Sequence, residues 1–226
     1  MAGTMLTYLD SYCERGGAVG MFAEPLNLYT NLFFVLAAAV SVFQLMRSRS
    51  AKGSRFDLWL LVLFLFTIGI GSALWHAFPS GTTVLMDVIP ITLFINAYII
   101  SALRRLFYLS WAKTGMWWVI YFIAGLAAQK FLPADMLNGT IMYIPTYLTL
   151  IIMTIGLHCR DRNAGSIFGL ALGAWTVSLI FRTLDMQLCH NVDMGTHFLW
   201  HTVNAWVLWR LLKLLIDDSA RPLHPK

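Results

Sequence analysis

Residues 56–78 read FDLWLLVLFLFTIGIGSALWHAF, an apolar segment that carries Ser72 and His76 near one of its ends. A helix of about 20 apolar residues crosses the roughly 30 Å hydrocarbon core of a bilayer. Backbone polar groups find no water there, so a helix is the expected conformation. The segment therefore predicts a transmembrane helix with polar side chains close to one membrane face.

The rest of the chain is also rich in apolar residues. Its 226 residues are 58% hydrophobic and 12% charged, and the mean hydropathy is +0.68, whereas soluble domains are about 25% charged. No repeat or linker divides the chain, so we predict a single domain, residues 1–226, that is an all-α membrane protein, a seven-transmembrane helix bundle. The predicted spans are residues 25–46, 56–78, 82–103, 114–132, 140–158, 165–183 and 195–216.

The basic residues predict how the bundle is oriented. The net charge is +5, but Lys and Arg lie in short clusters between apolar segments, which argues against a nucleic-acid surface. Of the 16 Lys and Arg residues, all except Arg15, Lys130 and Arg182 fall on one predicted side. Basic residues favour the cytoplasm, so we expect the amino terminus outside and the carboxyl terminus inside, in the plasma (inner) membrane. Residues 1–23 contain no continuous apolar core, so we predict no cleavable signal peptide.

Five polar side chains interrupt three apolar segments at one predicted depth. The second segment carries Ser72 and His76 near its outer end, the third carries Asp87 in its outer part, and the seventh begins with His197 and His201. Ionisable groups within membrane spans are costly and usually functional. Their convergence predicts a site near the outer membrane face.

The spacing of the histidines suggests a metal. His197 and His201 are four residues apart and present both imidazoles on one helix face, as helical zinc ligands do. With His76 they make three ligands and leave a fourth position for water, which is the pattern of catalytic zinc. Asp87 is a candidate general base and Ser72 a candidate hydrogen-bond donor to an oxyanion. The alternatives are histidines that bond neighbouring helices, or two axial ligands of a haem.

At these residues the chain resembles the alkaline ceramidase family, within the superfamily of seven-helix membrane hydrolases that includes the progestin and adiponectin receptors. The family patterns appear as Ser72-x-x-x-His76, as Asp87 in MDVIP, and as HFLWH over residues 197–201. The resemblance covers nearly the whole chain. It implies that the three histidines bind zinc, that Asp87 and Ser72 are catalytic, and that a ceramide amide is cleaved to a sphingoid base and a fatty acid.

The resemblance extends to the amino-terminal region, where eukaryotic members bind calcium. The motif is incomplete, because Ser11 stands where the family has Asp. In the other interpretation, Glu24 caps the first helix while Asn27 and Asn31 bond to neighbouring helices. The candidate calcium ligands are Asp10, Glu14 and Glu24.

The family also suggests a disulfide. Residues 184–189 resemble a family segment whose cysteine pairs with the one in the amino-terminal motif, which implies a Cys13–Cys189 bond. The predicted topology puts both cysteines outside, where oxidation is permitted. Cys159 is expected on the cytoplasmic side as a free thiol.

The substrate is expected to be a membrane lipid, ceramide or another N-acyl lipid, that enters sideways between helices. Two tryptophans flank the histidines, and two tyrosines of the fifth segment are candidates to help, although packing or interface anchoring also explains them. A lipid-responsive receptor with a structural metal and a haem-bearing electron carrier are the other functions considered. The candidate substrate-binding residues are Trp75, Tyr143, Tyr147 and Trp200.

Overall fold

The computed structural model describes residues 11–48, 54–133 and 135–220, and in these ranges the chain is helical and has no strand. The first span consists of two consecutive helices, α2 (Pro25–Thr30) and α3 (Leu32–Arg47), and six further long helices follow within the same ranges. These are α4 (Phe56–Ala77), α5 (Gly81–Arg105), α6 (Trp111–Phe131), α7 (Ile144–Arg160), α8 (Arg162–Leu188) and α9 (His197–Ala220). Two short 3-10 turns, η1 (Cys13–Arg15) and η2 (Thr140–Tyr143), precede α2 and α7.

Polar side chains define where several helices begin. The Ser80 hydroxyl accepts a hydrogen bond from Thr83 N, and the Thr83 hydroxyl accepts one from Ser80 N, so the pair forms a capping box at α5. Ser110 caps α6, and Asp161 accepts from two backbone N–H groups at the start of α8. The cap at Asp161 makes α8 longer than the predicted span, residues 165–183, because the helix starts at the polar connection itself.

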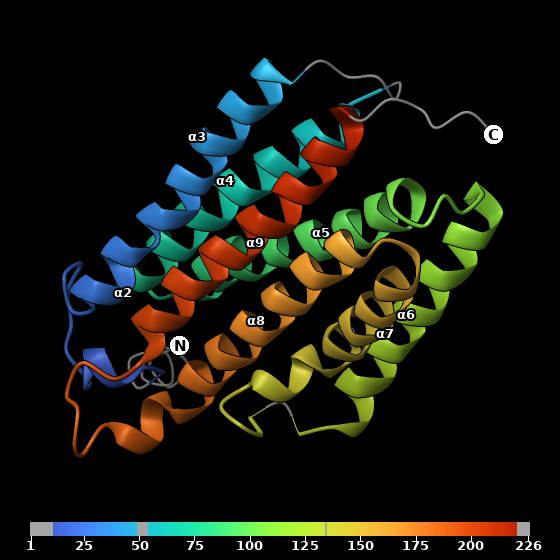
Figure 1. The fold of residues 1–226 in the computed structure, drawn as a ribbon. Coiled ribbons are helices and arrows are strands. Elements are labelled where there is room, and N and C mark those ends of the chain that lie inside the picture. Colours follow the sequence, from blue (N-terminus) through green and yellow to red (C-terminus); the bar gives the residue numbers. More distant parts are fainter. Residues whose placement is uncertain (1–10, 49–53, 134, 221–226) are drawn as a thin grey trace.

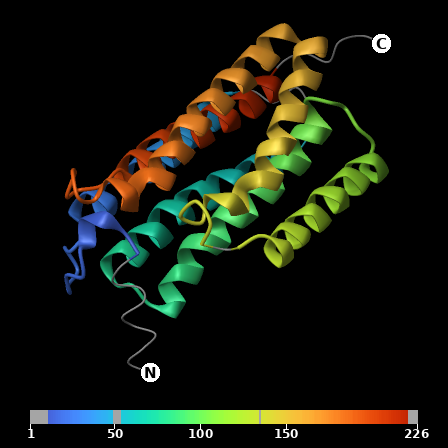
Figure 2. The same cartoon turned by 90° about the horizontal axis from the view of Figure 1, so that it is seen from below.

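The helices form a closed ring. Each packs against the next in sequence, and α9 packs against α3 to complete the circuit (Figure 1). In addition α9 contacts α4 and α5, so it reaches further into the bundle than α6, which lies at the rim (Figure 2). We call the end of the bundle where α4 and α8 end and α9 begins the site end. The extra contacts of α9 bring its first turns beside the last turn of α4 there.

The surface and composition of these helices are those of a membrane protein. Among the residues that the structure describes, five spans are long and apolar enough to cross a bilayer: Pro25–Arg47, Phe56–Ala77, Gly81–Arg105, Thr140–Arg160 and Arg162–Leu188. Their outer faces expose large apolar side chains, for example Leu63, Phe66 and Ile70 on α4. Continuous exposed apolar surface on this scale is explained by contact with lipid. The predicted all-α bundle of seven helices is therefore confirmed, and its orientation stays a prediction.

Much of the apolar core lies away from the site end. It includes the first half of α4, at Leu58 and Leu65, and the second half of α9, at Leu212 and Leu215. Phe168 packs into it from the first half of α8. This division leaves the opposite half free to hold polar groups without interrupting the core.

Candidate metal centre

Three histidines from two helices meet at the site end. His76 lies in the last turn of α4, and His197 and His201 lie in the first two turns of α9. All three are buried, and each offers a ligand atom within 4.8 Å of the other two. Within the described part of the chain, His76 Nε2, His197 Nδ1 and His201 Nε2 have no hydrogen-bond partner. Buried polar atoms are nearly always paired, so three unpaired nitrogens in one cluster form a candidate donor set for a metal ion.

Neighbouring side chains orient two of these imidazoles through their second nitrogen. His76 Nδ1 lies 2.6 Å from Glu24 Oε2, and His201 Nδ1 lies 3.0 Å from Thr30 Oγ1. Glu24 immediately precedes α2 and Thr30 is its last residue. A metal-ligating histidine is commonly oriented in this way by a carboxylate or another polar group. In both residues the nitrogen that stays free is the one that faces the cluster.

A buried carboxylate fixes the start of α9. Asp185 Oδ1 accepts from Thr196 N at 2.7 Å and from His197 N at 2.9 Å, and its Oδ2 accepts from Cys13 N at 3.1 Å. Gly195 has a φ of +59°, and a Cβ there would meet the Asp185 carboxylate and lie 2.6 Å from Cys13 Cβ. Only glycine fits this turn. The Asp185 carboxylate of α8 can therefore accept hydrogen bonds both from η1 and from the backbone of His197, the first candidate ligand on α9.

Ser72 and Asp87 lie side by side where α4 and α5 approach most closely. A Cβ at Gly71 would lie 2.6 Å from the Met86 carbonyl carbon and 3.3 Å from Asp87 N, so the two backbones touch at this glycine. Both side chains are buried, and Asp87 Oδ1 has no partner among the residues described. A hydroxyl and a carboxylate therefore lie together one helical turn before His76 on α4, and their catalytic roles stay a prediction.

The segment before α2 closes the site end. The Tyr12 ring lies over His197 with the ring centroids 4.1 Å apart, and Trp75 Nε1 donates to the Tyr12 hydroxyl at 3.3 Å. Burial raises the pKa of Tyr12 to about 12, so its hydroxyl stays protonated. The predicted disulfide, Cys13–Cys189, is present with Cα atoms 5.3 Å apart and ties this segment to the end of α8.

A buried ion pair supports the histidine cluster from this side. Arg15 Nε donates to Glu24 Oε1, and Arg15 Nη2 donates to the His76 carbonyl at 2.6 Å. Burial favours the neutral form of Glu24, but the hydrogen bonds from His76, Asn27 and Arg15 outweigh it and lower the pKa of Glu24. Glu24 is therefore a charged carboxylate whose partners are all protein groups.

Two of the three candidate calcium ligands, Glu14 and Glu24, have protein hydrogen-bond partners in the described structure. Asp10 lies outside the described residues. Glu14 accepts from two backbone N–H groups at the start of α2, at 2.7 and 2.8 Å, and burial raises its pKa. The expectation that Glu24 caps this helix is wrong, because its side chain makes no cap bond and Glu14 takes that place. Asn31 Nδ2 bonds to the Asn27 carbonyl of its own helix turn rather than to a neighbouring helix. Calcium binding stays a prediction.

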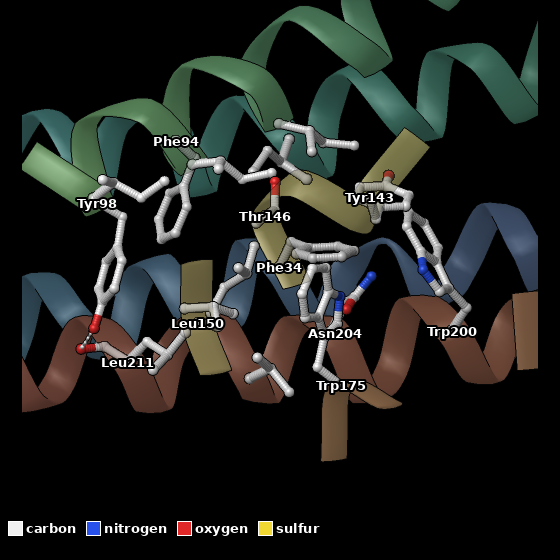
Figure 3. Close-up of a pocket in the computed structure, with 16 residues that line it drawn as sticks. Phe34, Phe94, Tyr98, Tyr143, Thr146, Leu150, Trp175, Trp200, Asn204 and Leu211 are labelled. Carbon is white, nitrogen blue, oxygen red and sulfur yellow. Dashed lines mark hydrogen bonds between the residues drawn. The ribbon is translucent and has the colours of Figure 1, made fainter. Parts of the chain in front are cut away.

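An apolar cavity lies within the bundle (Figure 3), and two of the residues that line it, Phe34 and Trp200, pack against His201 and His197. Trp200 lies at one end of the cavity. Its ring stacks on His197 at a centroid distance of 5.0 Å and an angle of 21°, and it lies 5.1 Å from the His201 ring. Ile68, Ile91 and Asn204 are among the residues that line the cavity. Each lies one helical turn deeper in the bundle than a candidate site residue on the same helix: Ser72 on α4, Asp87 on α5 and His201 on α9.

The two candidate tyrosines of the fifth span differ in position. Tyr143 lines the cavity and packs edge-on against Trp175 with centroids 5.9 Å apart. Tyr147 is not among the lining residues, and its hydroxyl pairs with Thr176 Oγ1 of α8 at 2.8 Å. Helix packing therefore accounts for Tyr147, whereas Tyr143 is placed to touch a bound molecule.

Three residues at the site, Thr30, Arg182 and Asp185, were not singled out from the sequence, and a fourth, Glu24, was singled out for another role. Thr30 and Asp185 position histidines, and Glu24 was considered only for calcium or capping. Arg182 of α8 lies over the Trp200 ring, 5.2 Å from its centroid. A signal was available for Arg182 and Asp185, since an ionisable residue within an apolar segment is a functional candidate.

Comparison with known proteins agrees with this geometry. The family model described as Ceramidase matches residues 10–208, a range that includes the three histidines, Ser72 and Asp87. The chain belongs to the ceramidase family. Membership supports a ceramide-hydrolysing function and makes the protein a lipid amidase of the membrane. No curated protein and no solved structure matches the chain.

Proposed function

We propose that this protein is a zinc-dependent hydrolase that cleaves the amide bond of ceramide or a related N-acyl lipid within the membrane. The observation that carries the proposal is the cluster of three buried imidazole nitrogens without protein partners, from His76, His197 and His201. Family membership supports the amide as the bond that is cleaved.

The donor set suits zinc. Structural zinc sites use four protein ligands, whereas catalytic sites use three and leave one position open. Among the described residues, these histidines are the one group of three or more metal-ligating side chains close enough to share an ion. Neutral imidazole is required for binding, and the partners at Glu24 and Thr30 hold the opposite nitrogen, which leaves the inner one as the ligand atom.

The neighbouring polar residues supply proton transfer and charge stabilisation. Zinc, when bound, lowers the pKa of water to about 7 and polarises a carbonyl group. In our proposal the Asp87 carboxylate accepts the proton of the attacking water and passes it to the leaving amine. The Ser72 hydroxyl donates a hydrogen bond to the carbonyl oxygen as negative charge develops on it. Tyr12 and the disulfide-linked segment keep bulk water out.

The cavity suits a substrate with an amide near the headgroup and long apolar chains. The scissile carbonyl would lie at the histidines, and an alkyl chain would extend past Trp200 between Phe34, Phe94 and Tyr143. Burial of methylene groups there stabilises the complex by about 0.8 kcal/mol each. We further propose that the site end faces outward. Arg15 is one of the few basic residues predicted on that side. Its charge is neutralised by the ion pair with Glu24, so it does not reduce the excess of basic residues on the opposite side.

Incubation of the purified protein with ceramides and other N-acyl lipids, followed by mass spectrometry, tests this function. We expect a free long-chain amine and a fatty acid, and loss of both products when a chelator removes the metal. Release of the products at an unchanged rate after verified metal removal would reject zinc dependence. Failure to cleave any amide would reject the hydrolase, and a visible absorption band would point to haem instead.

A further inference from the structure

The cavity below the histidines contains two polar atoms without partners. Asn204 is 7% exposed, and its Oδ1 has no hydrogen-bond partner among the residues described. Trp200 is 3% exposed, and its Nε1 is likewise unpaired within the described ranges. Both residues line the cavity, and they lie four residues apart on α9, so they share one face of the helix (Figure 3).

Two other polar side chains of this cavity, Tyr98 and Thr146, are already hydrogen-bonded within the protein. The Tyr98 hydroxyl donates to the Leu211 carbonyl at 3.3 Å, and Thr146 Oγ1 pairs with the Tyr121 hydroxyl at 3.0 Å. A buried acceptor left without a donor costs about as much as a lost hydrogen bond. Asn204 Oδ1 and Trp200 Nε1 therefore stand out as groups that lack a ligand.

The pairing of one donor with one acceptor restricts what that ligand is. A hydroxyl group donates one hydrogen bond and accepts others, so a single hydroxyl that lies within hydrogen-bond distance of both residues satisfies both atoms. A hydrocarbon chain satisfies neither, and a carboxylate would leave Asn204 Oδ1 unpaired. Asn204 lies three residues beyond His201, which is about 4.5 Å further into the bundle. The hydroxyl would thus lie a few bonds from an amide held at the histidines, on the side of the lipid chains.

We propose that Asn204 is a specificity-determining residue that accepts a hydrogen bond from a chain hydroxyl of the N-acyl lipid, while Trp200 Nε1 donates to the same oxygen. This inference rests on the proposed hydrolase function and names its preferred substrates, which are N-acyl lipids with a hydroxyl next to the amide. The hydroxyl belongs either to the long-chain base or to the second carbon of the acyl chain.

Matched substrates distinguish these two sources. The purified zinc-loaded protein is given a ceramide and its 3-deoxy analogue, and separately a ceramide with a 2-hydroxyacyl chain and one with a plain acyl chain. We expect kcat/KM to be about 10- to 100-fold higher for the hydroxylated member of one pair, which corresponds to the cost of leaving a buried polar group unpaired. Cleavage without a preference in either pair would overturn the role of Asn204 and leave the hydrolase intact. No cleavage of any member would instead reject the proposed function.

The variant Asn204→Leu tests the residue itself. Leucine is similar in size and has no polar atom, so the preference should fall to about 1 while kcat/KM for the deoxy or plain member is retained. Asn96→Leu is the matched control, because the Asn96 amide pairs with Trp118 Nε1 at 2.8 Å and lies outside the cavity. It should leave the preference unchanged.

Thermal unfolding separates specificity from a structural role. Removal of an unpaired acceptor should leave the Tm of Asn204→Leu equal to or above that of the wild type. A lower Tm together with an unchanged preference would overturn the proposal, because it would show that Asn204 stabilises the helix bundle and does not contact substrate. If Asn204→Leu fails to fold, Asn204→Val and the wild-type preference still decide the question.

Discussion

Glu24 and Thr30 act on the site through other residues, since each holds the nitrogen of a histidine that faces away from the cluster. Removal of such a partner usually weakens metal binding about 10- to 100-fold. Glu24→Gln loses the charge that pairs with Arg15 and the carboxylate that accepts from His76. We expect a 10- to 100-fold weaker zinc affinity, measured by competition with a chelator of known affinity.

Asp57→Asn is the control for that measurement. Asp57 also pairs with an arginine, Arg105 at 2.6 Å, but it lies in the first turn of α4, at the other end of the bundle. Its replacement should leave zinc affinity unchanged. Equal affinity of Glu24→Gln and wild type would show that the carboxylate does not orient His76.

Asp87 is expected to act on protons and not to bind the metal. Asp87→Asn keeps the shape of the side chain and removes its basicity. We expect bound zinc to stay at the wild-type level while turnover falls about 10²- to 10⁴-fold, the usual contribution of a general base. Elemental analysis and a product assay on the same sample measure both quantities. Wild-type turnover would remove Asp87 from the mechanism.

At the residue scale, the three histidines, Ser72 and Asp87 were predicted to belong to a functional site because they are polar side chains within apolar segments. Such groups are costly in a membrane span and are usually functional. The same reasoning missed the partners of those residues. Thr30 looks like any hydroxyl in a helix, and the role of Glu24 depends on a turn that brings Arg15 back against α4. Contacts between elements distant in the sequence have no local signature.

At the scale of elements, the start of α9 depends on one turn. Gly195 has a left-handed backbone and leaves no room for a Cβ beside Asp185. Gly195→Ala should therefore shift His197 as well as strain the turn, and we expect a lower Tm and weaker zinc binding. Differential scanning with and without added zinc measures both effects.

Gly173→Ala provides the comparison. Gly173 lies within α8, and a Cβ there would have no neighbour within 4 Å. Alanine is favoured over glycine inside a helix by about 0.5–1 kcal/mol, so this variant should match the wild type or exceed it in Tm. If the two alanine variants behaved alike, the turn at Gly195 would not position α9.

The approximate positions of the helices were readily predicted from the sequence, whereas their exact ends and the helices they pack against were not. Hydropathy locates spans because lipid demands long apolar helices. It did not show that α8 extends from Arg162 to Leu188, because a capping aspartate and an intrahelical arginine look like the limits of a span. The close approach of α4 to α5 rests on Gly71, which has no signal of its own in the sequence.

At the scale of the whole molecule, the bundle separates an apolar half from a polar end that is closed by a disulfide. The free thiol of Cys159 lies at the last turn of α7 and is exposed, and the other two of the three cysteines form the disulfide. Cys159 therefore reports the orientation of the membrane protein without any mutation. If the carboxyl terminus is cytoplasmic, a membrane-impermeant maleimide should label Cys159 only after intact cells are permeabilised.

Labelling of intact cells would place that end of α7 outside and reverse the proposed topology. Cys159→Ser is the control, since it removes the free thiol and should abolish the signal under both conditions. The structure fixes which helix ends lie together, and the labelling assigns each end to a side of the membrane.

The most direct test of the central claim is the zinc content of the purified protein and of the variants His76→Ala, His197→Ala and His201→Ala, measured by elemental analysis. Helical content measured by circular dichroism verifies that each variant is folded. We predict about one zinc per chain in the wild type, as expected for a single three-histidine site, and a loss of that zinc in each variant. Full retention of zinc in all three folded variants would contradict the account.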